Sequence, residues 1–239
     1  MGTLRIEPEI SAVSVVLVGE FNPAMLTPAW LAYHRILSKQ EASSVNEQIL
    51  IRNFSSFSSE WLNLQADNNR VMAAVSLAPY IRLRDFLLRI FEEQLLHTPI
   101  QAIGINRDVH FLAPTADHRD AMGRRLAPLA PWEGGASIVD FSGKHSGLTA
   151  LEMVQGTPSG RPIGDAIRVR VEPSIKTGQD GEGVYVAVND HFNLRHSDNG
   201  SESAGDLSTV LQSRFEESIR HSDQIIDYVM SLAKNALTH

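Results

Sequence analysis

A stretch of thirteen residues occurs in two related versions in this chain of 239 residues. Residues 83–95 read LRDFLLRIFEEQL, and residues 207–219 read LSTVLQSRFEESI. Both carry Leu, a second Leu four residues later, and Phe-Glu-Glu four residues after that, which is the spacing of an amphipathic helix. Each stretch also follows a strand–turn–strand pattern, and each half opens with a strand that leads into a helix. The match therefore predicts an internally duplicated fold.

The first half of the chain carries patterns that predict strands and helices in the order β-α-β-β-β-α. Apolar or alternating segments predict strands at 11–21, 48–52, 60–66 and 70–77. A helix is expected from Pro28 to about Leu37, because Thr27 is a good N-cap and proline suits the first helical position. The run Asp67-Asn68-Asn69 predicts a hairpin turn, since Asn and Asp tolerate positive φ.

The second half repeats the plan. Strands are expected at 100–111, 136–141, 147–154, 167–171 and 184–188, and helices at 115–126 and 207–236. We therefore expect an α+β fold, in which residues 1–98 and 99–239 are β-α-β-β-β-α halves of one pseudo-symmetric domain. The halves would share a curved, mostly antiparallel sheet packed with long helices.

Composition narrows the functional classes. The net charge of −7 disfavours a protein that binds the phosphate backbone of nucleic acids. The absence of cysteine excludes disulfides, thiolate metal sites and a cysteine nucleophile, and it fits a reducing cytoplasm. No segment approaches the roughly 18 apolar residues of a membrane span, and the start of the chain lacks a signal-peptide pattern. We expect a cytoplasmic protein without a membrane partner.

The segment 103–111, IGINRDVHF, is an unusual strand. Alternation sets Asn106, Asp108 and His110 on one face, while Arg107 interrupts the opposite, apolar face. Such a polar face is able to line a pocket, and Asp with His is a common acid–base combination. The alternative is that this face points to water or forms an internal hydrogen-bond network.

A second polar stretch lies at 189–196, NDHFNLRH. Asp190, His191 and His196 carry groups that bind divalent ions. However, the two histidines are five residues apart rather than at helical i, i+4 spacing, and no HExxH motif occurs. The simpler interpretation is a polar strand end, so we predict no metal and no cofactor.

Two further features are typical of contact surfaces. Arg168 and Arg170 flank apolar positions of their strand, with Tyr185 on the expected neighbouring strand. They are suited to an acidic protein segment or to RNA, or they belong to a solvated face. Trp132 lies in a loop, where it either fills the end of the core or anchors a partner.

The motifs of several enzyme classes are missing. No Walker-type phosphate loop, no GxGxxG that opens a helix and no GxSxG nucleophile elbow occurs in the sequence. The sequence therefore gives no local signature of a nucleophile, a phosphate site or a metal site.

Five segments carry a resemblance to a known group. They are residues 11–31, 103–111, 129–135, 167–174 and 183–192. Together they are similar to a sporadically distributed family of uncharacterised bacterial proteins, over about 11–219. The resemblance implies no catalytic residue, because none is established for that family. Sporadic distribution is a pattern of accessory genes, such as toxin–antitoxin and phage-defence modules.

We therefore predict a non-enzymatic binding or regulatory module in such a bacterial setting. It would act through an open sheet face or the groove between the halves, with another protein as partner and a homodimer as a further option. The first alternative is a small-ligand protein with a pocket between the sheet and a gripped helix. The second is an enzyme that uses Asp108 with His110, or Asp190 with His191. The expected contact residues are Asn106, Arg107, Asp108, His110, Trp132, Arg168, Arg170, Asp190 and His191.

Overall fold

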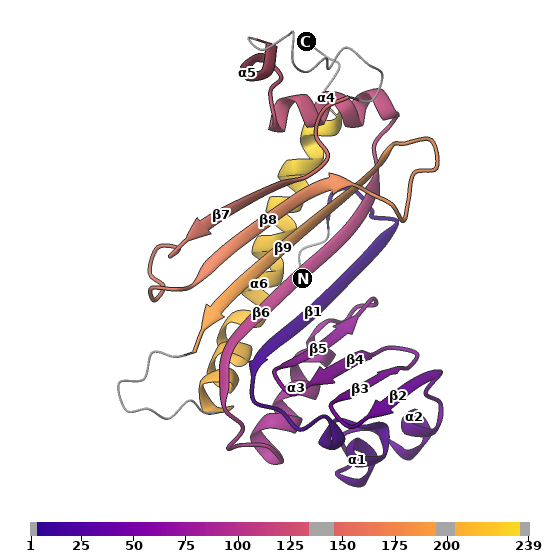
Figure 1. Cartoon of the computed structure of the whole chain (residues 1–239), viewed down its shortest axis with the longest axis vertical. Helices are drawn as coiled ribbons and strands as arrows, with labels where there is room; N and C mark the ends of the chain where they lie inside the picture. The colour runs from indigo at the N-terminus through magenta and orange to yellow at the C-terminus, as the bar shows by residue number, and fades with distance from the viewer. Residues whose placement is uncertain (1–3, 134–145, 195–203, 235–239) are drawn as a thin grey trace.

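The computed structural model describes residues 4–133, 146–194 and 204–234. These residues form a sheet of nine strands in the order β2-β3-β4-β5-β1-β6-β9-β8-β7 (Figure 1). All neighbouring strands pair antiparallel. The prediction of an α+β fold with an antiparallel sheet is confirmed. The strand expected at 136–141, and His196, lie outside the described residues.

The elements of the first half start with the central strand β1. They are β1 (Ile10–Gly19), the 3₁₀ helix η1 (Pro23–Met25), α1 (Pro28–Tyr33), α2 (Lys39–Ser43), β2 (Glu47–Ile51), β3 (Phe54–Ser58), β4 (Asn63–Asp67), β5 (Arg70–Val75) and α3 (Ile81–Glu93). The second half starts with β6, which pairs directly with β1. Its elements are β6 (Ile100–Leu112), α4 (Ala116–Leu126), α5 (Ala130–Glu133), β7 (Leu151–Gly156), β8 (Ala166–Pro173), β9 (Gly183–Asn193) and α6 (Ala204–Lys234).

Local signals in the sequence account for several boundaries. The Thr27 side chain accepts a hydrogen bond from the backbone N–H of Trp30, and Pro28 takes the first helical position of α1. That helix ends at Tyr33, four residues earlier than expected. β4 and β5 meet across Asn68-Asn69, as the hairpin signal predicted. The sequence analysis missed β3, whose five residues FSSFS contain three serines and only two apolar positions.

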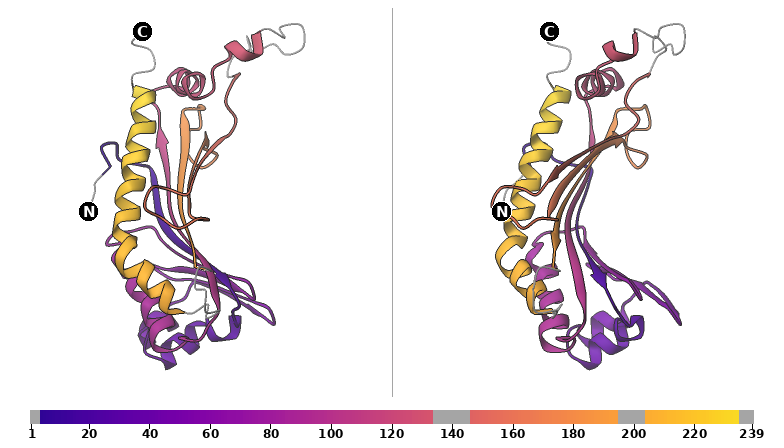
Figure 2. Two further views of the ribbon diagram at one scale, coloured as in Figure 1. Left: turned by 90° about the vertical axis from the view of Figure 1, so that its left-hand side faces the viewer. Right: turned by 60° about the vertical axis from the view of Figure 1, so that its left-hand side comes forward.

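Helices α3 and α6 pack on one face of the sheet. Figure 2 shows that the sheet curves away from α3 and α6, so the helix-covered face is convex and the opposite face is concave. On β1, Val13, Val15 and Leu17 point to the helices and are fully buried. The intervening residues Ser14 and Val16 point to the concave face. This alternation follows from the two-residue period of a strand.

Two hydrophobic clusters form the core on the convex side. The first joins α3 and the start of α6 to β1, β4 and β5. The second joins the end of α6 to β6, β8, β9 and α4. Helix α6 thus contributes Phe215 to the first cluster and Met230 to the second. It is the long connection between the two ends of the molecule.

Candidate functional site

The concave face carries polar side chains from the central strand β6. Asn106, Asp108 and His110 alternate on this face, as the sequence analysis predicted for the polar side of the strand. Asp108 and His110 line the same hollow on that face. The apolar side of β6 faces the helices, and Arg107 lies on that side.

Tyr185 of β9 joins Asp108 and His110 into one cluster. Tyr185 is the direct cross-strand neighbour of His110, and the two rings stack with their centroids 4.7 Å apart. The Tyr185 hydroxyl donates a hydrogen bond of 2.6 Å to the Asp108 carboxylate. Burial, together with this bond to a carboxylate, strongly raises the pKa of Tyr185. Tyr185 therefore stays a protonated donor, and it holds Asp108 in a fixed position.

Ser174, just after β8, fixes the protonation of His110. The backbone N–H groups of Lys176 and Thr177 both donate to Ser174 Oγ at 3.1 Å. The Thr177 hydroxyl is a third donor to this oxygen, also at 3.1 Å. Because Oγ is already the acceptor in these contacts, we assign its own proton to the bond of 2.8 Å with His110 Nδ1. His110 is then neutral, with its proton on Nε2. Burial lowers the pKa of His110, and the nearby Lys176 charge lowers it further, which agrees with this assignment.

A hollow of about 620 Å³ lies beside this cluster. It crosses the boundary between β1 and β6, so that both halves of the sheet contribute to its wall. The first half supplies small or flexible side chains, and the second half supplies polar and charged ones. The lining residues are Ala12, Ser14, Met72, Ala74, Asp108, His110, Thr149, Glu172, Pro173, Ile175, Lys176 and Tyr185.

A second polar contact follows the same face toward β8. Asn189 donates to Asn106 with Nδ2 and Oδ1 2.7 Å apart, and Arg168 donates to Asn189 at 3.3 Å. The Asn189 amide lies over Gly104, where a Cβ would come within 2.6 Å of its nitrogen. Glycine at position 104 therefore makes room for this cross-strand bridge.

Arg107 is not on this surface. It retains only 3% of its accessible surface and lies among the helices, where its Nε donates to Asp223 of α6 at 2.9 Å. Its Nη1 also donates to the hydroxyl of Ser11 at 2.8 Å. The predicted contact role of Arg107 requires an exposed side chain, whereas the structure gives it a buried ion pair. Burial raises the pKa of Asp223, and Arg107 opposes this shift.

Asp190 and His191 point to opposite faces of β9, so they do not form an acid–base pair. Asp190 faces α6, where it accepts hydrogen bonds from Arg161 and from Ser218, both at 2.5 Å. Arg161 also pairs with Asp165 at 3.0 Å and covers the ring of Phe192. His191 lies on the concave face, and burial, together with the Arg168 charge, lowers its pKa.

The remaining two predicted contact residues are accessible. Arg170 is on the concave face of β8 and pairs with Glu172 at 2.7 Å. Trp132 on α5 keeps 58% of its accessible surface, so it does not fill the core. Neither of these side chains lines the hollow beside Asp108.

The sequence analysis did not select Tyr185, Ser174, Lys176 or Glu172 as contact residues. Tyr185 was recognised only as a neighbour of the arginine strand. Its pairing with His110 depends on the β6–β9 register, which joins residues far apart in the chain. Ser174 and Lys176 reach the cluster through a turn that the sequence shows only as a polar loop.

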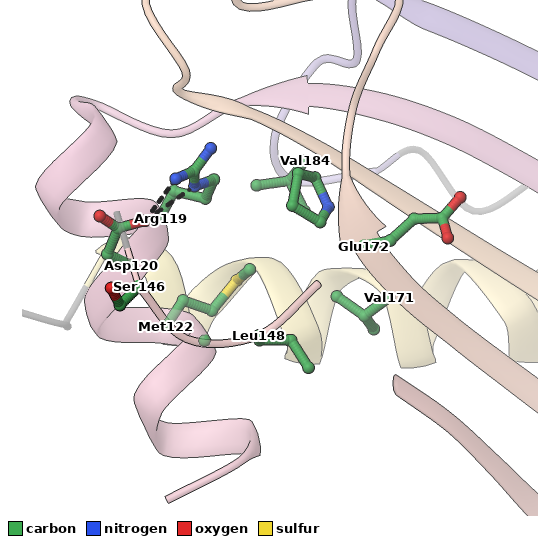
Figure 3. A pocket seen from close by; sticks show the side chains of 10 residues that line it. Arg119, Asp120, Met122, Ser146, Leu148, Val171, Glu172 and Val184 are labelled. Carbon is green, nitrogen blue, oxygen red and sulfur yellow. Dashed lines mark hydrogen bonds and ion pairs between the residues drawn. The ribbon is translucent and has the colours of Figure 1, made fainter. Parts of the chain in front are cut away.

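The other hollows found among the described residues are smaller, with volumes of about 260 Å³ or less. Figure 3 shows the space between α4 and the ends of β8 and β9, where Met122 and Leu148 approach Val171 and Val184. Its volume is about 20 Å³, so it holds little more than a water molecule. The sequence analysis offered a ligand pocket between the sheet and a gripped helix as an alternative. The large hollow lies on the concave face, whereas α6 lies on the convex face (Figure 2).

Two searches of the described residues gave negative results. No group of three or more His, Asp or Glu side chains there is arranged to hold a metal ion. No helix in that part of the chain combines the length and apolarity that crossing a membrane needs.

Comparisons with known proteins give no family. No family model matches the chain, and no curated protein matches it. A solved structure titled "Structure of FgChi7B" aligns with a TM-score of 0.21 and 9% sequence identity, over 90% of this chain and 45% of that chain. A similarity this weak carries no argument about fold or function, and the chain spans less than half of that protein.

Proposed function

We propose that the protein is a binding module that holds an extended segment of a partner protein on the concave face of its sheet. The observation that carries this proposal is the hollow of about 620 Å³ that crosses the β1–β6 boundary. Its polar wall is held in place before any partner arrives, because Tyr185, Asp108, His110 and Ser174 are joined by hydrogen bonds. Such preorganisation reduces the entropy cost of binding.

The chemistry of the wall indicates the kind of segment. Met72 and Ile175 offer apolar contact, and Ile175 is 97% exposed. Asp108 and Lys176 supply both signs of charge beside them. An extended polypeptide with one apolar anchor and polar side chains on either side of it fits this mixture.

A duplicated origin of the two halves is part of this proposal. Strands β1 and β6 lie together at the centre, β5 and β9 flank them, and β4 and β8 come next. The matched leucines Leu83 and Leu207 are both fully buried in one cluster. The next matched pairs, Leu87 with Leu211 and Phe91 with Phe215, are also buried in that cluster. These equivalences support a pseudo-twofold relation, which would place the hollow on the boundary between the halves.

An enzymatic role has less support from the same residues. His110 keeps only 6% of its accessible surface, and its Nδ1 is occupied by Ser174. Asp108 accepts a hydrogen bond from Tyr185 rather than from His110. A general base needs to reach the proton that it abstracts. The cluster is therefore better suited to holding a fixed surface than to transferring protons.

Site-specific photo-crosslinking tests the proposal. Benzoylphenylalanine replaces Ala74, which lines the hollow, in cells that make the protein. The control replaces Tyr228, which is 68% exposed on the convex side, on α6. We expect a discrete covalent adduct with another protein at position 74 and not at position 228. Equal labelling at the two positions, or no protein adduct at position 74, contradicts the proposal.

A variant that fills the hollow gives a second test once the adduct is identified. Ala74→Trp should weaken binding of that partner at least tenfold, whereas Tyr228→Ala should leave it unchanged. If Ala74→Trp instead displaces a small molecule that native mass spectrometry finds in the purified protein, the hollow is a small-ligand site.

A further inference from the structure

Strand β2 exposes three large aliphatic side chains in a row. Ile49, Leu50 and Ile51 keep 55%, 53% and 62% of their accessible surface. In a strand, consecutive residues point to opposite faces, so one packed layer does not cover all three. What they share is their position: among the described strands, β2 is the last at its edge of the sheet, and its one partner is β3.

This edge carries one charged residue, Glu47 at its start, and has no lysine, proline or bulge. Edge strands commonly carry lysine, proline or a bulge, which prevent pairing with another chain. Residues 47–51 read EQILI, and their register with β3 is regular.

The register of the β2–β3 hairpin shows which backbone groups are free. Arg52 and Asn53 form a two-residue turn, so Ile51 and Phe54 are the hydrogen-bonded pair next to it. Hydrogen-bonded and non-hydrogen-bonded pairs alternate along an antiparallel ladder. The N–H and C=O groups of Gln48 and Leu50 therefore point away from β3, toward the open edge.

We propose that β2 pairs with β2 of a second copy of this chain, antiparallel and with the twofold axis at Ile49. In this register Gln48 of each copy faces Leu50 of the other, and their outward backbone groups form hydrogen bonds. Ile49 faces Ile49 of the second copy in a non-hydrogen-bonded pair, where Cα atoms are about 4.5 Å apart. The two sheets become one continuous sheet.

The charges near the axis favour a second copy as the occupant. In a twofold contact the side chains near the axis meet their own kind, so that a charge there repels itself. Gln48, Ile49 and Leu50 carry no charge. Glu47 of each copy faces the uncharged Ile51 of the other, so no charge meets its own copy in this register.

The size of the contact predicts its strength. The strand has only five residues, so the interface falls at or below the low end of stable interfaces, which bury about 1,200 Å². The dimer should therefore be reversible and concentration-dependent.

The absence of cysteine from the chain gives a direct test of the register. Ile49→Cys places one thiol on the proposed axis, where a disulfide between copies is geometrically allowed. Val154→Cys on β7 is the matched control for an exposed edge, and Ile175→Cys controls for random collision because residue 175 is 97% exposed. Under mild oxidation we expect I49C to form a covalent dimer at least tenfold faster than either control.

Analytical ultracentrifugation of the unmodified chain and of Ile49→Lys completes the test. The unmodified chain should show a concentration-dependent dimer, and I49K should remain monomeric while keeping the circular dichroism of the folded protein. Cross-linking of I49C at the rate of I175C overturns the proposal. A chain that stays monomeric at millimolar concentration overturns it as well.

Discussion

At the scale of single residues, hydrogen bonds between side chains hold the polar groups of the concave face in place. Tyr185 donates to Asp108, and Ser174 donates to His110, so each contact has an assigned donor and acceptor. Buried polar groups without partners cost free energy, and these bonds remove that cost on a face without packed helices. The bond from Ser174 keeps His110 neutral, so the folded protein resists protonation of this side chain.

Stability should fall as the pH decreases below the ordinary histidine value of 6.5. Burial lowers the pKa values of His110 and His191 in the folded protein. Just below pH 6.5 the unfolded chain therefore binds more protons than the folded chain, and the free energy of unfolding decreases with falling pH. Around His110, Lys176 reinforces the shift, while Asp108 and Glu172 oppose it.

The substitution His110→Gln measures how much His110 contributes to the pH dependence of the free energy of unfolding. We expect this variant to lose less free energy of unfolding than the unmodified chain when the pH is lowered from 7.5 to 5.5, as measured by urea denaturation. His191→Gln should remove a second, independent share. An unchanged pH dependence in H110Q would show that Ser174 does not hold the imidazole in its neutral form.

At the scale of elements, Arg161 fastens the β7–β8 connection to the end of β9. Its guanidinium binds the carboxylates of Asp165 and Asp190 and donates to the carbonyl oxygen of His191 at 2.8 Å. Arg161→Ala leaves both buried carboxylates without their cation. We expect a loss of about 3 kcal/mol in the free energy of unfolding, as measured by denaturant titration.

Arg170→Ala is the matched control for this prediction. Arg170 and Glu172 form an ion pair on a more exposed surface, so its loss should cost less than about 1 kcal/mol. Arg161→Lys should fall between the two, because an ammonium keeps the charge but not the planar fork of donors. A loss in R161A no larger than that in R170A contradicts the assigned role of Arg161.

Elements with strong local patterns could be predicted from the sequence. The leucine spacing of 83–95 gave α3, and alternation gave β5, β8 and β9. The strand β3 was missed because a serine, Ser55, takes a core position there. Its hydroxyl donates to the Leu26 carbonyl oxygen, a long-range partner that no local pattern reveals. Only part of the candidate site could be predicted, because local patterns show residues of one strand and not their long-range partners. Asp108 and His110 share one strand, whereas Tyr185 reaches them through long-range register.

At the scale of the whole molecule, the described residues form two hydrophobic clusters, and helix α6 enters both. Leu207, Leu211 and Phe215 of α6 pack in the first cluster, and Ile226 and Met230 pack in the second. Strand β6 also joins them, through Ile105 in the first and Phe111 in the second. The clusters should therefore unfold together, because loss of one removes packing from elements that the other shares.

A proline in the middle of α6 tests this coupling. Glu217 is exposed near the middle of α6, between Phe215 and Ile219, which both pack in the first cluster, so Glu217→Pro breaks the helix without removing a buried side chain. Proline removes one backbone hydrogen bond and clashes with the preceding turn, at a cost of about 3 kcal/mol or more. We expect calorimetry to show one transition for the unmodified chain and two for E217P.

Glu217→Ala separates the backbone effect from the loss of the side chain. Glu217 pairs with Arg214 on the surface, and removal of that pair should cost less than about 1 kcal/mol and leave a single transition. If E217P also keeps one transition at a lower temperature, the sheet alone couples the clusters, through β6. Two transitions in E217P identify the continuous helix as the element that makes the two halves one cooperative unit.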